Sequence, residues 1–503
     1  MKRDGTHKSI WQYDSSFLQN TTEIPHTVDT IIVGAGLTGI SLAFELQKRG
    51  QRCLVIEQHG IGSGTTGGTT AHLNNFFDVS YDQLISRFGS DAAGAVAEKA
   101  GRAADLVAAN IEECAISCDF DRCSFYLLST EDKQDKQLED IFAAHQELGI
   151  PARRVSEIPF PVSFREAIEI EGQAQFHPLK YITALANEFE VRGGAVLLDT
   201  RISSHKNTDA GVEVQTEFGR KFTAKNLVWA THIPPGITRF STMNAPYRSY
   251  ALAAKLAGPP PKLAQGADLC DPYHYFRYHL IKGEWHIIIG GFDHKTGHEE
   301  DTDKPFEALK AYAHDHFTFT DIVAQWSAQY YVPVDGLPYI GKMPGEERVF
   351  IATGYNGNGM TWGTLAAGII ADLMDGAENR LAETVSPSRL EFTASAREFV
   401  KENADVVFHL IKDRFAADKK AELDSLKKGE GKIIVFEGKN VAAYRNEEDA
   451  LKLLTAACPH MGCTVRFNTA EKTWDCPCHG SRFDTDGNLL TAPATENLKP
   501  INF

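Results

Sequence analysis

The densest group of metal-binding side chains lies near the C-terminus, where four of the nine cysteines fall between positions 458 and 478. Two motifs carry them, Cys-x-His at 458–460 and Cys-x-Cys-His at 476–479. Thiolate and imidazole groups bind zinc or iron. Two Cys and two His could hold tetrahedral zinc, but this pairing of motifs, with two further cysteines and a Gly-Ser beside them, matches zinc fingers poorly. The motifs therefore predict a metal centre that is not a zinc finger.

A second site is indicated near the N-terminus, where residues 34–39 (GAGLTG) fit the pattern G-x-G-x-x-G. The hexapeptide follows an apolar run typical of a buried strand and opens a helical pattern, which is the context this motif requires. Gly34 permits a tight turn, and Gly36 lets the backbone approach a pyrophosphate at the helix N-terminus. Gly39 allows the helix and the strand to pack closely. We therefore expect a dinucleotide at this turn.

Glu57 ends the next expected strand, where a carboxylate can accept hydrogen bonds from the ribose hydroxyls of the adenosine. The alternative, a glycine-rich turn without a ligand, is disfavoured by this context. A reductase that binds both FAD and NAD(P)H would usually carry two such fingerprints, and we find one. The chain is therefore expected to bind a single dinucleotide.

Four further segments resemble the D-amino-acid oxidase superfamily of FAD-dependent amine oxidoreductases, which includes glycine and sarcosine oxidases. The segments are 62–68 (GSGTTGG), 226–231 (NLVWAT), 336–341 (GLPYIG) and 354–360 (GYNGNGM). The resemblance covers roughly residues 26–380 and implies that the dinucleotide is FAD. Gly357 and Gly359 precede a helical pattern, so the N-terminus of that helix could stabilise negative charge on the reduced flavin.

The resemblance implies a set of FAD-binding residues: Gly34, Gly36, Leu37, Thr38, Gly39, Glu57, Gly64, Thr65, Thr66, Thr231, Gly354, Asn356, Gly357, Asn358, Gly359 and Met360. Some relatives attach FAD covalently through a His in the loop after the first phosphate motif. Gly68 aligns with that His, and His72 is off register. We therefore expect FAD to be bound without a covalent link.

The expected catalytic residues are Tyr275, Arg277 and Tyr331. The segment around Tyr275 and Arg277 resembles the family segment that borders the substrate side of the flavin. Arg277 could pair with a substrate carboxylate, although a structural Arg on a sheet is an equal alternative. Tyr331 is a candidate for an aromatic lining. No general base is required if the amine enters neutral and gives hydride to flavin N5.

The C-terminal motifs resemble a Rieske [2Fe–2S] domain. The resemblance implies that Cys458 and Cys476 bind one iron and that His460 and His479 bind the other. Cys463 and Cys478 would correspond to the two cysteines that form a disulfide in the quinol-oxidising branch. Two neutral imidazoles in place of thiolates make the cluster less anionic, with a potential of roughly −150 to +300 mV.

The elements that must position these residues are read from periodicity as strands at 29–33, 52–57, 221–230 and 349–352, and helices at 37–49 and 360–374. Residues 84–148 look mostly helical. We predict an α/β FAD-binding domain of Rossmann type, an interleaved α+β substrate domain and a small all-β Rieske domain. The expected bounds are 26–110, 150–240 and 335–385 for FAD binding within residues 1–387, 240–335 for the substrate, 388–428 for a helical linker, and 429–503 for the Rieske domain.

The composition is that of an ordinary globular protein, with a net charge of −16. This charge argues against a nucleic-acid binder or a protein of anionic membrane surfaces. Neither a signal peptide nor an apolar run long enough for a membrane span is visible, so a cytoplasmic protein is expected. An oligomer is compatible with the sequence.

Together these features predict an FAD- and Rieske-containing dehydrogenase. An amine or amino acid would reduce FAD, and the electrons would pass singly to the cluster and on to an unknown acceptor. One alternative is an oxidase that uses oxygen, with a structural or regulatory Rieske domain. Another is a redox module fed by an external donor.

Overall fold

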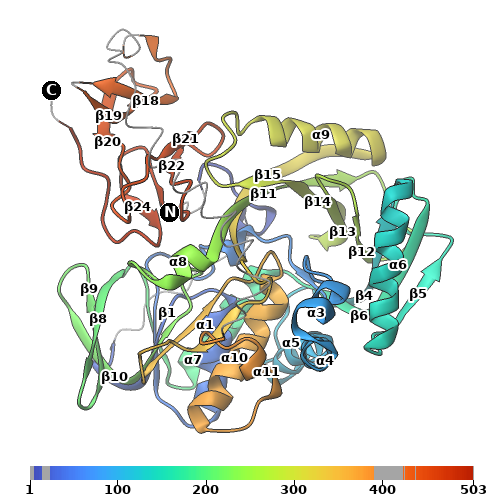
Figure 1. The fold of residues 1–503 in the computed structure, drawn as a ribbon, viewed down its shortest axis with the longest axis horizontal. Coiled ribbons are helices and arrows are strands. Elements are labelled where there is room, and N and C mark those ends of the chain that lie inside the picture. The colour runs from blue at the N-terminus through green and yellow to red at the C-terminus, as the bar shows by residue number, and fades with distance from the viewer. Residues whose placement is uncertain (1–4, 14–22, 390–422, 424, 437, 502–503) are drawn as a thin grey trace.

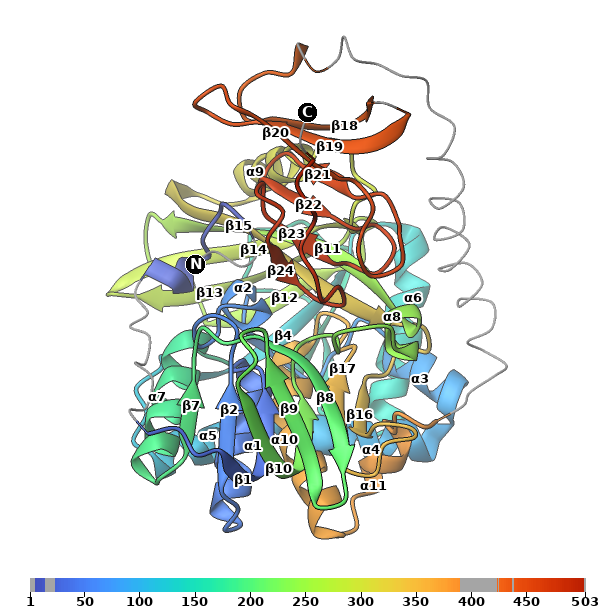
Figure 2. The same cartoon turned by 90° about the vertical axis from the view of Figure 1, so that its left-hand side faces the viewer.

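The structure is a computed structural model, and it describes residues 5–13, 23–389, 423, 425–436 and 438–501. Within these residues the chain forms two large sheets, one below the other in Figure 2, and two small sheets at the C-terminal end. The expected helical linker at 388–428 lies almost entirely outside the described residues. None of the described helices is long and apolar enough to cross a membrane.

The first sheet has the strand order β16-β17-β10-β1-β2-β7, with the ribbon β8–β9 attached to β10. Its strands are β1 (Thr27–Val33), β2 (Cys53–Ile56), β7 (Ala195–Leu197), β8 (Ile202–Thr208), β9 (Gly211–Thr216), β10 (Lys221–Trp229), β16 (Tyr339–Lys342) and β17 (Val349–Thr353). The five strands from β17 to β7 are parallel, so their carboxyl ends meet at one edge. Ligands of open parallel sheets bind at that edge.

The central strand β1 is apolar on both sides, as expected of a parallel strand covered on two faces. Ile32 belongs to the same core as helices α1 (Leu37–Lys48) and α10 (Gly359–Asp375). Ile31 faces the opposite core, which includes Val212 and Val214 of the β8–β9 ribbon. The predicted strands and helices of this region match the observed bounds within two residues.

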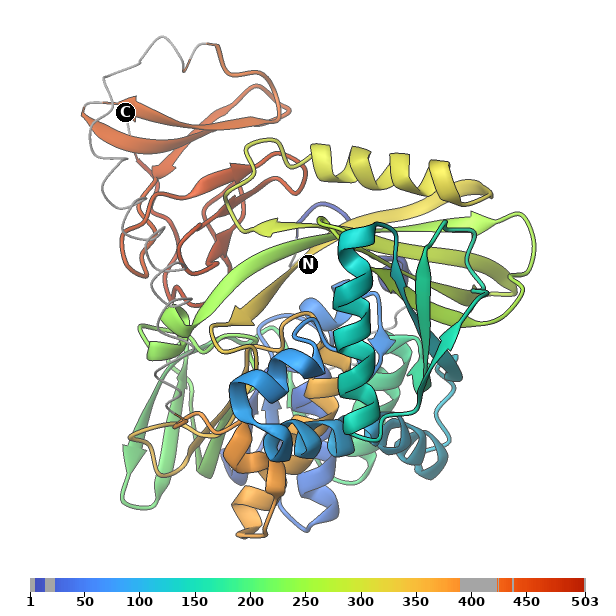
Figure 3. The ribbon, with the colours of Figure 1, turned by 45° about the vertical axis from the view of Figure 1, so that its right-hand side comes forward.

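The second sheet is nine-stranded and mainly antiparallel, in the order β15-β11-β14-β13-β12-β4-β6-β3, with β5 paired to β6. Its strands are β3 (His72–Leu73), β4 (Asp121–Ser129), β5 (Ala152–Val155), β6 (Glu166–Gln175), β11 (Asn244–Leu256), β12 (Ala264–Asp268), β13 (His274–Ile281), β14 (Glu284–Lys295) and β15 (Phe319–Pro333). Helix α6 (Asp132–Glu147) packs across β4, β5 and β6 (Figure 3).

Residues 84–148 are mostly helical, as expected. Residues 121–129 form a strand within this region, because Phe125–Leu128 is a buried apolar run that pairs with β6 and β12. One sequence expectation is corrected here. Residues 152–175 were assigned to the FAD-binding part, but β5 and β6 lie in the second sheet, since β6 pairs with β4. The second sheet therefore draws on more of the chain than residues 240–335.

The remaining helices connect or cover these sheets (Figure 1). They are the 3₁₀ turn η1 (Ile10–Tyr13) and the helices α2 (Thr65–Gly68), α3 (Tyr81–Phe88), α4 (Ser90–Gly101), α5 (Ala103–Glu113), α7 (Pro178–Val191), α8 (Arg239–Met243), α9 (Lys304–His316) and α11 (Arg380–Thr384). Helix α1 packs against both α7 and α10, and the three helices share a core with Ile32 of β1.

The C-terminal domain consists of two small antiparallel sheets, in agreement with the predicted all-β fold. The outer sheet contains β18 (Glu430–Phe436), β19 (Lys439–Arg445) and β20 (Leu451–Thr455). The inner sheet contains β21 (Arg466–Asn468), β22 (Thr473–Asp475), β23 (Arg482–Phe483) and β24 (Leu489–Thr491). Figure 1 shows the inner sheet against the ends of β11 and β15.

Buried charges join this domain to the rest of the molecule. Glu471 is buried, and its carboxylate accepts hydrogen bonds from Ser327 Oγ (2.7 Å) and from the backbone N–H of His7 (3.1 Å). Burial opposes the ionisation of Glu471, but hydrogen bonds from His7 and the charge of Arg248 hold its pKa below the ordinary 4.5. Asp475 lies 3.0 Å from Arg482 and 3.7 Å from Arg248 of β11. The domain is therefore held by fully buried polar contacts.

We predict that Glu471→Gln destabilises the protein by about 1–3 kcal/mol. The amide NH2 group of Gln would face a hydrogen-bond donor, Ser327 Oγ or the N–H of His7, and could not accept its hydrogen bond. Thermal unfolding measures this loss. The stability difference should shrink as the pH falls below about 4.5, because the lowered pKa of Glu471 contributes stability only while the carboxylate is ionised. The exposed Glu496→Gln is the control and should change stability by less than about 0.5 kcal/mol. Equal stability of both variants would contradict the prediction.

Candidate cofactor cavity and metal centre

A cavity of about 450 Å³ opens at the carboxyl edge of the first sheet and continues between it and the second sheet. Its walls come from the turn after β1, the loop that contains α2, strand β15 and the segment 355–360. Leu489, Ala492, Ala494 and Thr495 of the C-terminal domain also line it. One cavity therefore joins all three parts of the fold.

The turn after β1 has the geometry that its glycines predict. Gly34 has φ +109°, and a Cβ there would lie 2.5 Å from the carbonyl oxygen of Ala230. A Cβ on Gly39 would lie 1.9 Å from the carbonyl oxygen of Gly34. The backbone of α1 can approach both the sheet and a ligand only because these Cβ atoms are missing.

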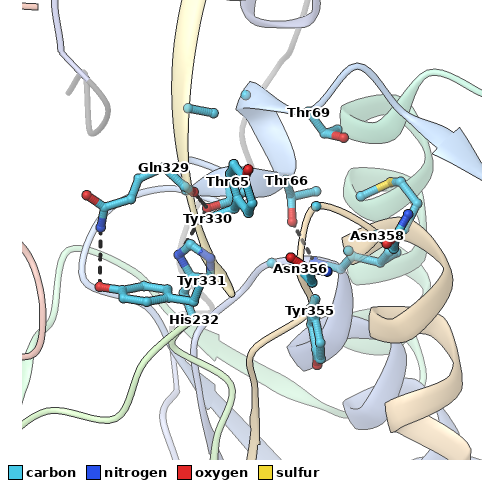
Figure 4. Close-up of a pocket in the computed structure, with 18 of the residues that line it drawn as sticks. Thr65, Thr66, Thr69, His232, Gln329, Tyr330, Tyr331, Tyr355, Asn356 and Asn358 are labelled. Atoms are coloured by element: carbon cyan, nitrogen blue, oxygen red, sulfur yellow. Dashed lines mark hydrogen bonds between the residues drawn. The ribbon is translucent and has the colours of Figure 1, made fainter. Parts of the chain in front are cut away.

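Two side chains shape the cavity around this turn. Thr66 of α2 accepts a hydrogen bond from the backbone N–H of Leu37 (3.0 Å), which links the loop that contains α2 to the start of α1 (Figure 4). Glu57 accepts hydrogen bonds from the N–H groups of Ala35 (2.8 Å) and His59 (2.9 Å). These bonds hold the carboxylate against the cavity wall, in the position expected for a ribose partner.

The segment 354–360 closes the cavity from the other side. Asn356 has φ +47°, and its N–H donates to the carbonyl oxygen of Tyr331 (3.0 Å). Asn358 caps α10, whose first N–H groups, from Gly359 onward, carry the positive end of a 17-residue helix dipole. Such an end suits the negative charge of a reduced flavin.

The structure brings the predicted cofactor residues together. All sixteen line the cavity except Gly39 and Gly354, which act through close packing: a Cβ on Gly354 would lie 2.4 Å from Asn244 Oδ1. Gly68 and His72 also line the cavity, and burial lowers the pKa of His72 to about 3. These residues form a cradle that fits a dinucleotide.

Tyr275 lines the cavity, and the sequence did not indicate the polar group around it. Its hydroxyl lies 2.8 Å from Ser249 Oγ, and Ser249 donates to Asp293 (2.6 Å). Tyr273 and Tyr330 also donate to Asp293. Asp293 and Ser249 belong to different strands, β14 and β11, and neither lies in a motif, so only their period-two positions on the sheet could have suggested them.

Arg277 is a correction, because it is fully buried and does not line the cavity. Its Nη1 donates to the carbonyl oxygen of Ala71 (2.8 Å), and its guanidinium lies 5.2 Å from the centre of the Trp11 ring. On β13 it shares a face with Tyr275, but it lies two residues further along the strand, where Ala71 and Trp11 cover it and separate it from the cavity wall. Arg277 therefore has a structural role in the sheet, and it is not placed to bind a substrate carboxylate.

The four expected cluster ligands come from two loops, between β20 and β21 and between β22 and β23. Cys458, His460, Cys476 and His479 are all buried, and the two imidazole rings lie 4.9 Å apart. All four ring nitrogens are buried, and none has a hydrogen-bond partner among the described residues. Burial, with a contribution from His460, lowers the pKa of His479 to about 4, so it is neutral, as a metal ligand must be. Orphaned imidazole nitrogens beside two free thiols fit a [2Fe–2S] cluster.

The two ligand loops are covalently joined. A disulfide links Cys463 to Cys478, and these sulfurs lie within 4.8 Å of the thiol of Cys476. Because Cys463 and Cys478 are bonded to each other, they are not available as thiolate ligands. Ser481 Oγ accepts the N–H of Ala494 (2.9 Å), which leaves its own proton for another acceptor.

Tyr331 connects the cavity with the cluster loops. Its ring lies 4.7 Å from His232 in the cavity wall, and its hydroxyl donates to the carbonyl oxygen of His479 (3.2 Å). Gln329 donates to Tyr331 Oη (3.2 Å) and to the carbonyl oxygen of Gly480 (2.9 Å). Figure 4 shows Gln329, Tyr331 and His232 side by side. Tyr331 is thus a bridging residue as well as part of the lining.

We predict that Gly39→Ala yields protein without bound flavin and lowers stability by about 1–3 kcal/mol, because the new Cβ overlaps the Gly34 carbonyl. Gly368→Ala is the control, since a Cβ at this position of α10 meets nothing within 4 Å. It should retain flavin and gain roughly 0.5–1 kcal/mol from helix propensity. The flavin-to-protein absorbance ratio and thermal unfolding measure both effects, and a flavin-loaded Gly39→Ala protein would refute the expected role.

Comparison with known proteins agrees with this geometry. The family model "FAD dependent oxidoreductase" matches residues 29–373, and the model "Rieske [2Fe-2S] domain" matches residues 416–502. The Bacillus subtilis (strain 168) protein YhfW, which carries the provisional name of a Rieske 2Fe-2S iron-sulfur protein, is 32% identical over 96% of this chain and 94% of its own. The Escherichia coli (strain K12) gamma-glutamylputrescine oxidoreductase is 22% identical over 70% of this chain and 85% of its own.

Among solved structures, glycine oxidase from Geobacillus kaustophilus superposes with a TM-score of 0.61 at 20% identity, covering 73% of this chain and all of its own. This likeness shows that the two proteins share a fold. The first family model spans more than half of the chain, and the relative from Bacillus subtilis spans both parts. The chain therefore belongs to the D-amino-acid oxidase family of FAD-dependent oxidoreductases and carries a Rieske [2Fe–2S] domain at its C-terminal end.

Proposed function

We propose that this protein oxidises an amine or amino acid in the cavity and passes the electrons to the Rieske cluster and on to a separate acceptor. When bound, FAD supplies two-electron chemistry and the cluster accepts one electron at a time. The relatives named for gamma-glutamylputrescine and glycine support an amine or amino acid as the substrate class.

The observation that carries this proposal is the contact between the cavity wall and the cluster loop. Tyr331 lines the cavity and donates to the carbonyl oxygen of His479, which is an expected cluster ligand. Gln329 makes a parallel contact with Gly480. A domain with only a regulatory or structural role would not require its ligand loop at this wall. The arrangement supports electron transfer within one chain.

The residues of the chain have separate tasks in this reaction. The turn after β1 and Glu57 hold the dinucleotide, and the N-terminus of α10 stabilises negative charge on it. The tyrosines around Asp293 form the wall of the substrate end. We place the protein in the cytoplasm, where thiols such as its free cysteines outside the cluster stay reduced. The electron acceptor would be a protein or oxygen.

Anaerobic addition of a substrate amine should bleach the flavin and then produce the EPR signal of the reduced cluster. Cys476→Ser is the matched control: its flavin should still bleach, but without an EPR signal, because one iron ligand is lost. Flavin that bleaches while an intact cluster stays oxidised would overturn the proposal and favour an oxidase that uses oxygen.

Tyr331→Phe should slow cluster reduction without changing flavin bleaching, because it removes the hydroxyl that bonds to His479 and keeps the ring. We expect roughly a fivefold effect, the equivalent of about 1 kcal/mol for one hydrogen bond. Tyr81→Phe is the control, since it removes a buried hydroxyl of α3 that has no hydrogen-bond partner in the part of the chain that the structure describes. Stopped-flow absorbance separates the two phases, and equal rates in all three proteins would remove Tyr331 from the path.

A further inference from the structure

The substrate end of the cavity contains a carboxylate that is surrounded only by neutral donors. Asp293 of β14 accepts hydrogen bonds from Ser249 Oγ (2.6 Å), Tyr330 Oη (2.8 Å) and Tyr273 Oη (3.1 Å). Ser249 has one proton and gives it to Asp293, so Tyr275 must donate its own proton to Ser249. Every hydroxyl of this network thus directs its proton toward Asp293, an arrangement that suits an ionised carboxylate.

A second carboxylate faces the same space. Asp78 lines the cavity, and its Oδ2 would lie 2.5 Å from a Cβ on Gly357, in the segment that closes the cavity. The enclosed surroundings of Asp78, and then the charge of Asp293, raise its pKa to about 7. Asp78 is accessible from the cavity, and its carboxylate has no ion pair among the described residues. Two neighbouring carboxylates repel each other when both are ionised, and a bound cation would relieve that repulsion.

Positive side chains do not supply that counter-charge. Among the described residues that line the cavity, Arg201 is the single Arg or Lys. It lies at the Glu57 end, where it donates to the carbonyl oxygen of Thr495 (2.7 Å) and pairs with Glu217. His72 is neutral, and Arg277 lies outside the cavity. A bound carboxylate would therefore face two acids without a cationic partner, at a high desolvation cost.

Aromatic rings complete this end of the cavity. Tyr273, Tyr275 and Tyr330 all line it, and the rings of Tyr273 and Tyr275 lie 5.8 Å apart. Aromatic faces attract cations, most strongly where water is excluded. A cavity wall that combines carboxylates with aromatic rings is typical of a site that binds an ammonium group.

We propose that the cavity binds its substrate as a cationic amine without a carboxylate beside the reacting carbon, with the ammonium group between Asp293 and Asp78 and against the tyrosine rings. This inference rests on the proposed function and narrows its substrate class from amines and amino acids to amines. The cation supplies the charge that the two carboxylates lack, and an α-amino acid would bring a third negative charge into the same space.

The test is a titration of the oxidised holoenzyme with two ligands of similar shape and opposite charge, tert-butylammonium and pivalate. Neither has a hydrogen on the carbon that bears the charged group, so neither can be oxidised there. The change in flavin absorbance measures binding. We expect tert-butylammonium to bind at least tenfold more tightly than pivalate. Pivalate binding equally well, or tert-butylammonium failing to bind, would overturn the proposal.

Asp293→Asn should weaken tert-butylammonium binding by about tenfold or more, the usual scale for one lost charge-assisted contact. Asp78→Asn is a second variant and should act in the same direction, which keeps the test valid if one protein folds poorly. Asp321→Asn removes an exposed carboxylate at the far end of β15 and should leave binding unchanged. Unchanged binding in both cavity variants would refute the assignment.

Binding of tert-butylammonium should tighten as the pH rises through about 7, because Asp78 ionises there while an alkylammonium stays charged to about pH 10. The tyrosines that face Asp78 stay protonated over this range, because burial raises the pKa values of Tyr273, Tyr275 and Tyr330. Burial also raises the pKa of Asp293, while its three hydrogen bonds favour the ionised form. In Asp78→Asn this pH dependence should become weaker, because Asp78 no longer titrates. The titration involves no turnover, so its result is independent of whether electrons reach the cluster.

Discussion

The close approach of the C-terminal domain to the cavity wall is the constraint on which the rest of the structure depends. Gly480 has φ +77°, and a Cβ there would lie within 2.8 Å of Gln329 Nε2 and Tyr331 Oη. The glycine lets the carbonyl oxygens of His479 and Gly480 reach those side chains. Any bulkier residue would push the cluster loop away from the cavity and break both hydrogen bonds.

This approach persists because buried charges hold the domain. Glu471 joins the N-terminal segment, β15 and the C-terminal domain, and Asp475 lies between Arg482 and Arg248. A buried ion pair contributes little net stability compared with apolar packing, but breaking it leaves an uncompensated charge. Such contacts favour one docking geometry over many, which the proposed electron transfer between cavity and cluster would need.

The same cavity has two electrostatic ends. At the first sheet, backbone N–H groups and the start of α10 present positive dipole ends, which suit phosphates and a reduced flavin. At the other end, Asp293 of β14 and Asp78 of the segment before α3 present carboxylates among tyrosine rings. An anionic cofactor and a cationic substrate would thus each lie against a cavity wall of the opposite charge.

The sequence by itself determined what depends on local geometry. A turn such as residues 34–39 and a ligand loop such as 476–479 place their atoms through neighbouring backbone angles, so motif and structure coincide. The tertiary structure alone decided what depends on strands far apart in the chain. Arg277 is covered by Ala71 and Trp11, while Asp293, Ser249 and Tyr330 meet at the cavity from β14, β11 and β15. Strand order and register set which face a side chain occupies, and they arise from long-range pairing that no local pattern encodes.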